Sequence, residues 1–268
     1  MSKRIGFIGC GNMAVAMIGG MIKSKIVTPE QFIVSNRGLE KLMRVKEMYQ
    51  VETTQDNKEV ARVADVLFLA VKPNQYQTVI DEIKEEMNKE TIVVSIAAGQ
   101  SIATIEKAFG FEVKLIRSMP NTPALVQEGM SALIPNVFVS EVELFQVREL
   151  FNSFGKSELI SEDLMDSFIA VSGSSPAYVY LFIEAMADAA VLQGIPREQA
   201  YRFAAQAVLG AAKMVLESGA HPGALKDAVC SPGGTTIEAV VELEKSGMRA
   251  SVMKAMEVCA AKGRALTS

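Results

Sequence analysis

The stretch RIGFIGCGNMAVAM, residues 4–17, joins an apolar run to a glycine-rich turn and to the start of a helix-like pattern. Gly9, Gly11 and Ala14 stand in G-x-G-x-x-A spacing at the turn. In such a turn Gly9 permits a sharp reversal, Gly11 lets backbone approach a pyrophosphate, and Ala14 allows close packing of helix on strand. The helix start adds N–H donors and the positive end of a dipole. The stretch therefore predicts the first strand, turn and helix of a dinucleotide-binding fold.

Two alternatives exist for this N-terminus. The basic start MSKR, the apolar run and AVA at residues 14–16 resemble a secretory signal peptide. Glycines at positions 6, 9, 11, 19 and 20, together with Asn12, weaken a continuous membrane helix. A bare G-x-G-x-x-A also occurs in ordinary strand–helix turns. The segments that follow favour the buried strand, turn and helix.

Further apolar runs alternate with helix-like patterns through the first half of the chain. The runs are residues 4–9, 31–35, 65–71, 91–97, 112–119 and 131–135, and the clearest helix-like patterns are residues 12–24, 38–49, 74–87 and 142–154. Such alternation is typical of βαβ units, and apolar strands without polar alternation indicate a sheet covered on both faces. We expect an α/β fold in which residues 1–160 form an N-terminal Rossmann-type, doubly wound, mostly parallel sheet.

The end of the second run indicates which dinucleotide is bound. An NAD site uses an Asp or Glu there to hold the ribose 2′-OH. Here the chain reads VSNRG, with Ser35, Asn36 and Arg37 and no carboxylate. Arg37 can pair with a 2′-phosphate, and Ser35 and Asn36 can donate hydrogen bonds to it. NADP(H) is therefore favoured, with NAD(H) as the alternative cofactor; a polar helix cap beside a surface Arg is the structural alternative.

Two later strand ends and one loop also suit a cofactor. AVKP (70–73) and SIAAG (95–99) place small residues where ligands of open α/β sheets lie, which leaves room for a flat ring. Lys72 pairs with a phosphate or stands in solvent. In RSMPNTPALV (117–126), prolines on both sides of Asn121 predict an extended loop that stops any helix. This loop suits the wall of a nicotinamide site or a turn at a domain edge.

Composition excludes several classes of protein. Apolar residues make up 49% of the 268 residues and charged residues 22%, which supports a substantial core. The net charge of −4, without a basic cluster, argues against nucleic-acid binding. Cys10, Cys230 and Cys259 are too few and too widely spaced for a disulfide framework or a metal cluster, so a reducing cytoplasm is expected. The single histidine, His221, leaves little scope for a metal site or a Ser-His-Asp triad; it is expected to start a helix.

From about Ser161 onward the strand patterns stop. Residues 174–194 predict a helix with Ser175 as N-cap, Pro176 at its first position and Gly194 at its end. Residues 196–219 predict a second helix, a third is expected to follow the stretch at residues 230–240, and a last covers about 248–266. Helices that are apolar nearly all round must be buried. We therefore expect residues 161–268 to form an all-α domain that dimerises; the alternative is a compact monomeric bundle.

CSPGGTTIEAV, residues 230–240, lies between two helical segments. Its glycines leave backbone N–H groups accessible, and Thr235 and Thr236 add hydroxyls beside a helix start. Together these groups form a receptor for a small anion such as a carboxylate. An ordinary helix–helix turn with Thr caps is the alternative.

The chain resembles the pyrroline-5-carboxylate reductases along nearly its whole length. The resemblance is carried, in order, by FIGCGNMA, VSNR, AVKP, IAAG, RSMPNTPALV, AVSGSSPAYVY and HPGALKDAVCSPGGTTIEA. It implies NADPH-dependent hydride transfer to the C=N carbon of 1-pyrroline-5-carboxylate, the last step of proline biosynthesis. It also implies a homodimer, or a higher homo-oligomer, whose active site lies near the subunit interface, with no nucleic-acid or membrane partner.

The resemblance further implies site residues. Cofactor binding falls to Ile8, Gly9, Cys10, Gly11, Asn12, Met13, Ser35, Asn36, Arg37, Asn57, Ala70, Val71, Lys72, Pro73, Ile96, Ala97, Ala98 and Asn121. Substrate binding falls to Ser231, Gly233, Gly234, Thr235 and Thr236. Backbone at Gly234 and Thr235 holds the substrate carboxylate, and the Thr236 hydroxyl is the catalytic group at the imine nitrogen. The chain departs from the family at Cys230, Ser175 and Ala228.

The expected chemistry suits this composition. A cyclic imine is basic enough to be protonated near neutral pH, and the iminium carbon then accepts hydride directly, so the protein mainly positions two partners. Two alternatives are a β-hydroxyacid dehydrogenase and a non-enzymatic NADP(H)-binding regulator. The first needs a catalytic Lys, and residues 163–190 contain none. The second has no use for SPGGTT. No metal site is expected.

Overall fold

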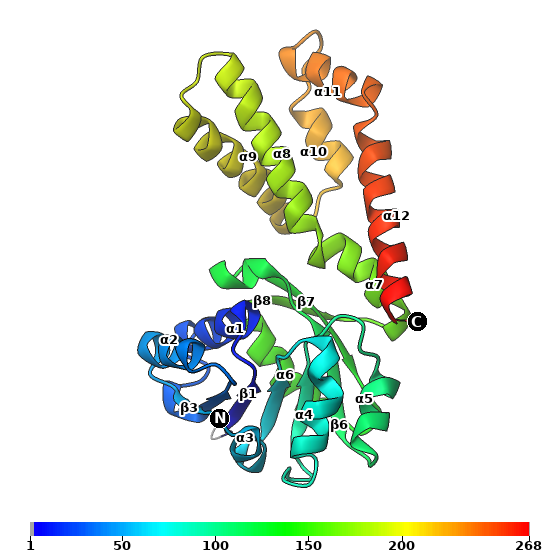
Figure 1. The fold of residues 1–268 in the computed structure, drawn as a ribbon. Coiled ribbons are helices and arrows are strands. Elements are labelled where there is room, and N and C mark those ends of the chain that lie inside the picture. The colour runs from blue at the N-terminus through cyan, green and yellow to red at the C-terminus, as the bar shows by residue number, and fades with distance from the viewer. Residues whose placement is uncertain (1–2, 268) are drawn as a thin grey trace. The chain divides into compact units, whose positions relative to one another are not determined.

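The computed structural model describes residues 3–267. Its N-terminal part is built around one β-sheet (Figure 1). Within those residues it has eight strands in the order β3-β2-β1-β4-β5-β6-β7-β8. The strands are β1 (Ile5–Ile8), β2 (Phe32–Ser35), β3 (Glu52–Thr54), β4 (Val66–Leu69), β5 (Ile92–Ser95), β6 (Lys114–Met119), β7 (Gly129–Pro135) and β8 (Gly155–Leu159). All neighbours pair in parallel except β6 and β7. The Rossmann-type, mostly parallel sheet is confirmed.

The order of strands reverses between β1 and β4. From β1 the chain winds outward through β2 and β3, and it then returns to add β4 on the other side, with Ile5 opposite Val66. In open α/β sheets a ligand crevice forms at such a switch point, beyond the carboxyl ends of the strands. The turn after β1 therefore lies where the sequence places the dinucleotide.

Helices connect and follow the strands. They are α1 (Asn12–Lys23), α2 (Leu39–Tyr49), α3 (Asn57–Val63), α4 (Tyr76–Ile83), α5 (Ile102–Phe109), α6 (Glu141–Asn152), α7 (Met165–Phe168), α8 (Ser175–Leu192), α9 (Arg197–Ser218), α10 (Pro222–Ala228), α11 (Thr235–Lys245) and α12 (Met248–Thr267). Short 3-10 helices are η1 (Pro29–Gln31), η2 (Pro73–Gln75), η3 (Thr122–Val126) and η4 (Glu162–Leu164), and η5 (Ile169–Gly173) is a π-helix.

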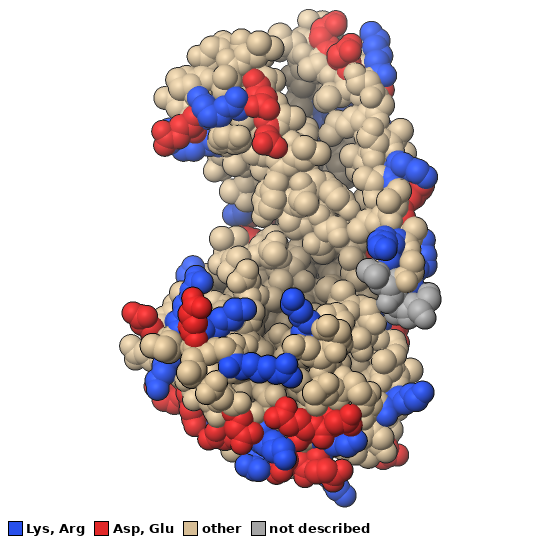
Figure 2. All heavy atoms as spheres, in the orientation of Figure 1, with Lys and Arg blue, Asp and Glu red and all other residues tan. Residues whose placement is uncertain are grey.

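The chain divides into two compact units. The first comprises Met1–Gly173 and Cys259–Ser268, and the second comprises Ser174–Val258. The second unit is helical, and many of its large apolar side chains are exposed, among them Leu181, Leu192, Phe203 and Leu216. In Figure 2 the visible face of its helices is mostly tan, so few charged side chains cover them.

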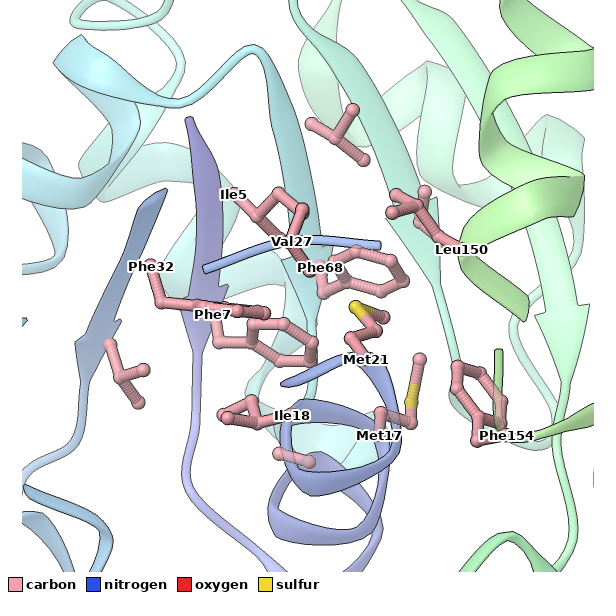
Figure 3. Packing of buried hydrophobic residues seen from close by; sticks show 14 of the residues in the cluster. Ile5, Phe7, Met17, Ile18, Met21, Val27, Phe32, Phe68, Leu150 and Phe154 are labelled. Carbon is pink, nitrogen blue, oxygen red and sulfur yellow. The ribbon is translucent and has the colours of Figure 1, made fainter. Parts of the chain in front are cut away.

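The core of the first unit lies on both faces of the sheet, as the apolar strands predict. One cluster packs α1, α2 and α6 on one face; there the rings of Phe7 and Phe68 stack with centroids 4.5 Å apart, and Met17 and Met21 of α1 pack nearby (Figure 3). The other cluster packs α3, α4 and α5 on the opposite face around Leu67 and Ile80. Because helices cover both faces of the sheet, ligands can approach it only beyond the ends of its strands.

The structure corrects two local expectations. The N-cap of α8 is Ser174, not Ser175, because the helix begins one residue earlier and takes Pro176 into its first turn. In RSMPNTPALV residues 117–119 end β6 and Asn121 is extended, but residues 122–126 form η3, not the expected helix-free loop. Proline tolerates the first turn of a helix because its missing N–H has no partner there. The expected last helix, about 248–266, is confirmed as α12.

Candidate active site

The glycine turn brings the ends of β1, β2 and β4 together. Gly9 N–H donates to Ser35 O at 2.9 Å, and Ala70 N–H donates to Ile8 O at 2.8 Å. Gly9 has φ +103°, and a Cβ there would lie 2.4 Å from the carbonyl oxygen of Ala70. Gly9 is therefore required by the close approach of the β4 end as well as by its backbone conformation.

Gly11 has a different environment. It is the N-cap of α1, and among the described residues no side chain caps the helix there and no atom lies within 4 Å of a Cβ placed on Gly11. The space beside the helix start is thus open, and the N–H groups of Asn12 and Met13 lie at the positive end of the α1 dipole. This geometry fits the pyrophosphate of a dinucleotide.

Cys10 lies inside the turn and is buried. Its backbone N–H donates to Asn36 Oδ1 at 3.3 Å, and Asn36 Nδ2 donates to Gly38 O at 3.0 Å, so Asn36 connects the turn to the loop after β2. Burial raises the pKa of the Cys10 thiol, against the opposing effect of Lys41. The neutral thiol packs as a small apolar group.

The loop after β2 matches the chemistry of a 2′-phosphate. Arg37 is exposed, and its guanidinium forms no ion pair within residues 3–267. Ser35 is fully buried, and its hydroxyl donates to Asn57 Oδ1 at 2.7 Å rather than facing solvent. The free cation, without a carboxylate at this strand end, fits NADP(H).

The ends of β4 and β5 form the next part of the edge. Ala70 and Val71 are half-buried, and Lys72 and Pro73 are exposed. After β5, Ile96 is half-buried, Ala97 is buried and Ala98 is exposed. Apart from Lys72, these side chains are small or apolar, as the sequence predicts for strand ends that receive a flat ring.

Tyr76 holds these two strand ends in place, a role that motif reasoning missed. Its hydroxyl donates to Leu69 O at 2.7 Å and lies 3.0 Å from Ser95 Oγ. Burial raises the pKa of Tyr76 to about 12, against the opposing effect of the Ser95 hydrogen bond. The signal in the sequence is an aromatic residue on the apolar face of α4, three residues after Pro73.

The side chain of Asn121 forms hydrogen bonds to other residues of the first unit. Its Nδ2 donates to Ser172 O at 3.1 Å and to Ser172 Oγ at 3.2 Å, while its Oδ1 accepts from Met130 N–H at 2.9 Å. The side chain is 8% exposed. Asn121 therefore fixes the loop after β6 to η5 and to β7.

In the second unit, residues 230–236 form an open helix start. Gly233 has φ +68°, and Gly234 is the N-cap of α11 without a side-chain cap. Gly234 N–H donates to Ser231 O at 3.0 Å inside the loop, whereas the N–H groups of Thr235 and Thr236, in the first turn of α11, have no acceptor among the described residues. Both threonines are exposed. The dipole, the free N–H groups and the two hydroxyls suit a small carboxylate.

His221 has the structural position that the sequence predicts. It is the N-cap of α10, and its Nδ1 accepts from Gly223 N–H at 3.0 Å. The ring nitrogen is thus used in capping.

Both parts of the chain match known families. Residues 162–266 match the family of pyrroline-5-carboxylate reductase dimerisation domains, and residues 4–99 match the coenzyme F420-dependent NADP oxidoreductase family. Pyrroline-5-carboxylate reductase of Escherichia coli (strain K12) is 52% identical over 267 residues, which cover 100% of this chain and 99% of the relative.

Solved structures agree with the sequence matches. A pyrroline-5-carboxylate reductase from Coxiella burnetii superposes with a TM-score of 0.94 at 37% identity, covering 100% of both chains. Plasmodium falciparum pyrroline carboxylate reductase, solved with NADP bound, has a TM-score of 0.89 at 34% identity and covers 99% of this chain and 98% of its own. The likeness extends through both units.

Proposed function

This chain belongs to the pyrroline-5-carboxylate reductase family, and we propose that it reduces 1-pyrroline-5-carboxylate to L-proline with NADPH. The observation that carries the proposal is the start of α11, which follows Gly233 and Gly234 and has no side-chain cap. A glycine turn alone is shared by many dehydrogenases, whereas an open helix start lined by two threonines suits a small carboxylate substrate. Family membership also favours NADP(H), which is consistent with the residues after β2.

For the cofactor, we propose that the first turn of α1 and the backbone from Ile8 to Met13 hold the pyrophosphate. Arg37 pairs with the 2′-phosphate, and Asn36 supports the loop that carries it. Residues 70–73 and Asn57 line the adenosine and ribose side, and residues 96–98 and Asn121 line the nicotinamide side. When bound, NADPH supplies the hydride that the C=N carbon accepts.

For the substrate, we propose that the N–H groups of Thr235 and Thr236 hold the carboxylate, with Ser231 and Gly233 shaping the loop. The Thr236 hydroxyl hydrogen-bonds the imine nitrogen. The imine is already protonated near neutral pH, so these groups orient an activated substrate instead of supplying a strong acid. This assignment is consistent with the capping role of His221.

The test is an assay of the purified wild type with pyrroline-5-carboxylate and NADPH. We expect one L-proline formed for each NADPH consumed, with NADH used less efficiently. A 3-hydroxy acid with NADP⁺ serves as the comparison substrate for the β-hydroxyacid dehydrogenase alternative, and no turnover is expected with it. Absence of imine reduction by the folded protein would refute the proposal.

We further propose a homodimer built through the second unit. The apolar helices expose side chains that a monomer would leave in water, such as Leu181 (67%), Leu192 (89%), Phe203 (60%) and Leu216 (82%). By length and composition alone, Glu162–Leu192 would also suit a membrane span. The match to a dimerisation family supports a partner subunit instead. Light scattering should report at least a dimer at micromolar concentration, and a monomer would contradict this proposal.

We propose residues 1–160 as the nucleotide domain and residues 161–268 as the domain for substrate binding and dimerisation. We also propose a cytoplasmic location, in keeping with the thiols of Cys10 and Cys230, which form no disulfide among residues 3–267. Cell fractionation tests the location: recovery in the soluble fraction is expected, and recovery with membranes would contradict it.

A further inference from the structure

Three side chains from three elements form one hydrogen-bonded chain beside the carboxyl end of β2. Ser35 Oγ donates to Asn57 Oδ1 at 2.7 Å, and Asn57 Nδ2 donates to Glu82 Oε2 at 2.8 Å. Ser35 ends β2, Asn57 begins α3 and Glu82 lies in α4. Ser35 is buried, and the other two side chains are half-buried. The chain thus links the strand that ends near Arg37 to two helices on one face of the sheet.

The carboxylate of Glu82 decides how the Asn57 amide is oriented. An ionised carboxylate only accepts hydrogen bonds, whereas an amide has a donor end and an acceptor end. Turning the Asn57 amide over would place its carbonyl oxygen against the Glu82 carboxylate. The observed orientation instead gives a charge-assisted hydrogen bond and directs the carbonyl oxygen to the Ser35 hydroxyl. Within the described part of the chain, the other acceptor of the Ser35 hydroxyl is Phe7 O, at the longer distance of 3.5 Å.

One N–H of Asn57 is left over by this arrangement. Nδ2 carries two hydrogens, one directed to Glu82, and no acceptor for the other is found among residues 3–267. Ribose and phosphate oxygens of a dinucleotide are acceptors, so a fixed N–H donor suits them, whereas a carbonyl oxygen in its place would repel them. Glu82 therefore determines whether Asn57 offers a donor or an acceptor.

We infer that Glu82 is a positioning residue for nucleotide binding, acting through Asn57. This inference rests on the proposed function, because it takes NADPH as the ligand at this edge of the sheet. Glu82 itself need not touch the cofactor. Its effect should therefore appear in the affinity for NADPH and should depend on an intact Asn57.

The test measures the Kd for NADPH by fluorescence titration of the wild type, Glu82→Ala and Glu82→Gln. We expect Glu82→Ala to raise Kd about five- to tenfold, the loss of one well-oriented hydrogen bond. Glu82→Gln should raise the Kd for NADPH less. The carbonyl oxygen of the new glutamine still accepts from Asn57, but its NH2 group can also donate, so the Asn57 amide is no longer held in one orientation. Asp81→Ala is the matched control: it removes a carboxylate from the same helix, and Asp81 contacts only Gln77 and Lys84 among the described residues. Its Kd should match the wild type.

A double-mutant cycle separates positioning from a merely structural role. Asn57→Ala should weaken NADPH binding, and adding Glu82→Ala to it should weaken binding no further, because the group that Glu82 orients is gone. Additive losses, or an unchanged Kd in both folded Glu82 variants, would overturn the inference. If Glu82→Ala does not fold, the Glu82→Gln pair of the cycle gives the same decision. Because binding is measured without turnover, a wild type that binds NADPH but reduces no imine would refute the proposed function alone.

Discussion

The guanidinium of Arg117 in β6 lies 2.6 Å from the carboxylate of Glu162, and the two side chains differ sharply in burial, at 3% and 35% exposed. Glu162 Oε1 also accepts from Ile102 N–H at 2.9 Å, whereas Arg117 Nε has no hydrogen-bond partner among the described residues. The ion pair thus joins a buried cation, incompletely satisfied, to an anion that keeps some contact with water.

This asymmetry predicts unequal costs of breaking the pair. Glu162→Ala strands a buried guanidinium and should lower the free energy of unfolding by about 3 kcal/mol. Arg117→Met removes the buried charge together with its unpaired Nε, and it should cost only about 1 kcal/mol. Urea unfolding at one protein concentration measures both. Equal losses, or a larger loss for Arg117→Met, would contradict this account.

Gly9 and Gly11 should respond oppositely to alanine. At Gly9 the positive φ and the 2.4 Å approach to Ala70 O make a Cβ intolerable, so Gly9→Ala should unfold or strongly destabilise the first unit. At Gly11 no atom of residues 3–267 lies within 4 Å of an added Cβ, so Gly11→Ala should leave the melting temperature nearly unchanged. It should still raise the Kd for NADPH by at least about tenfold, because the added methyl group occupies the pyrophosphate space. Thermal melts and NADPH titration check both variants; tight NADPH binding by Gly11→Ala would refute the assigned pyrophosphate position.

The strands that sequence reasoning found are those that the sheet buries on both faces. β1, β2, β4 and β5 are buried throughout, which is why they read as plain apolar runs. The two strands it missed, β3 and β8, are the sheet edges, and most of their side chains are partly or fully exposed. An edge strand buries too little to need an apolar pattern, so its sequence carries no signal of its own.

The site shows a similar division. Loop motifs such as the glycine turn were found because local backbone geometry dictates their residues. Tyr76, Glu82 and Glu162 were missed because their roles depend on partners that folding brings near. Glu82 meets Asn57 across 25 positions of sequence, and Glu162 meets Arg117 across 45. No spacing rule within one segment could reveal such contacts.

Arg37 should determine cofactor preference. Its exposed guanidinium offers a charge-assisted hydrogen bond to the 2′-phosphate, which NADH lacks. Arg37→Ala should raise KM for NADPH about tenfold and change KM for NADH about twofold or less. Arg44→Ala on α2, the helix that follows this loop, is the matched control, since it removes an equal charge from another exposed position. An NADPH/NADH preference that Arg37→Ala leaves intact would refute the 2′-phosphate assignment.

Thr236 should act through its hydroxyl and not through its bulk. Thr236→Ala should lower kcat/KM for pyrroline-5-carboxylate about tenfold or more, because the imine nitrogen loses its hydrogen-bond partner. Thr236→Ser keeps the hydroxyl at the start of α11 and should retain most of the activity. Steady-state kinetics at saturating NADPH distinguish the two. Equal activity in the alanine and serine variants would remove Thr236 from the mechanism without affecting the assigned reaction.

Glu143 should contribute to acid resistance. Burial raises its pKa, but hydrogen bonds from Lys114 Nζ at 2.7 Å and from Ser140 N–H and Oγ at 2.9 and 2.7 Å outweigh that and lower it to about 2. Because the folded value lies below the ordinary 4.5, the stabilisation is complete above pH 4.5 and disappears as the pH falls towards 2. Glu143→Gln should therefore be less stable than wild type at neutral pH, with a difference that shrinks between pH 4.5 and 2.

Urea unfolding across that pH range measures the difference. Glu90→Gln is the control: Glu90 also pairs with Lys114, but its side chain is 78% exposed, and an exposed ion pair contributes little. Its stability should follow the wild type at every pH. A gap between Glu143→Gln and wild type that stays constant from pH 7 to pH 2 would show that Glu143 stabilises the start of α6 by packing, and not as an ionised group held by Lys114 and Ser140.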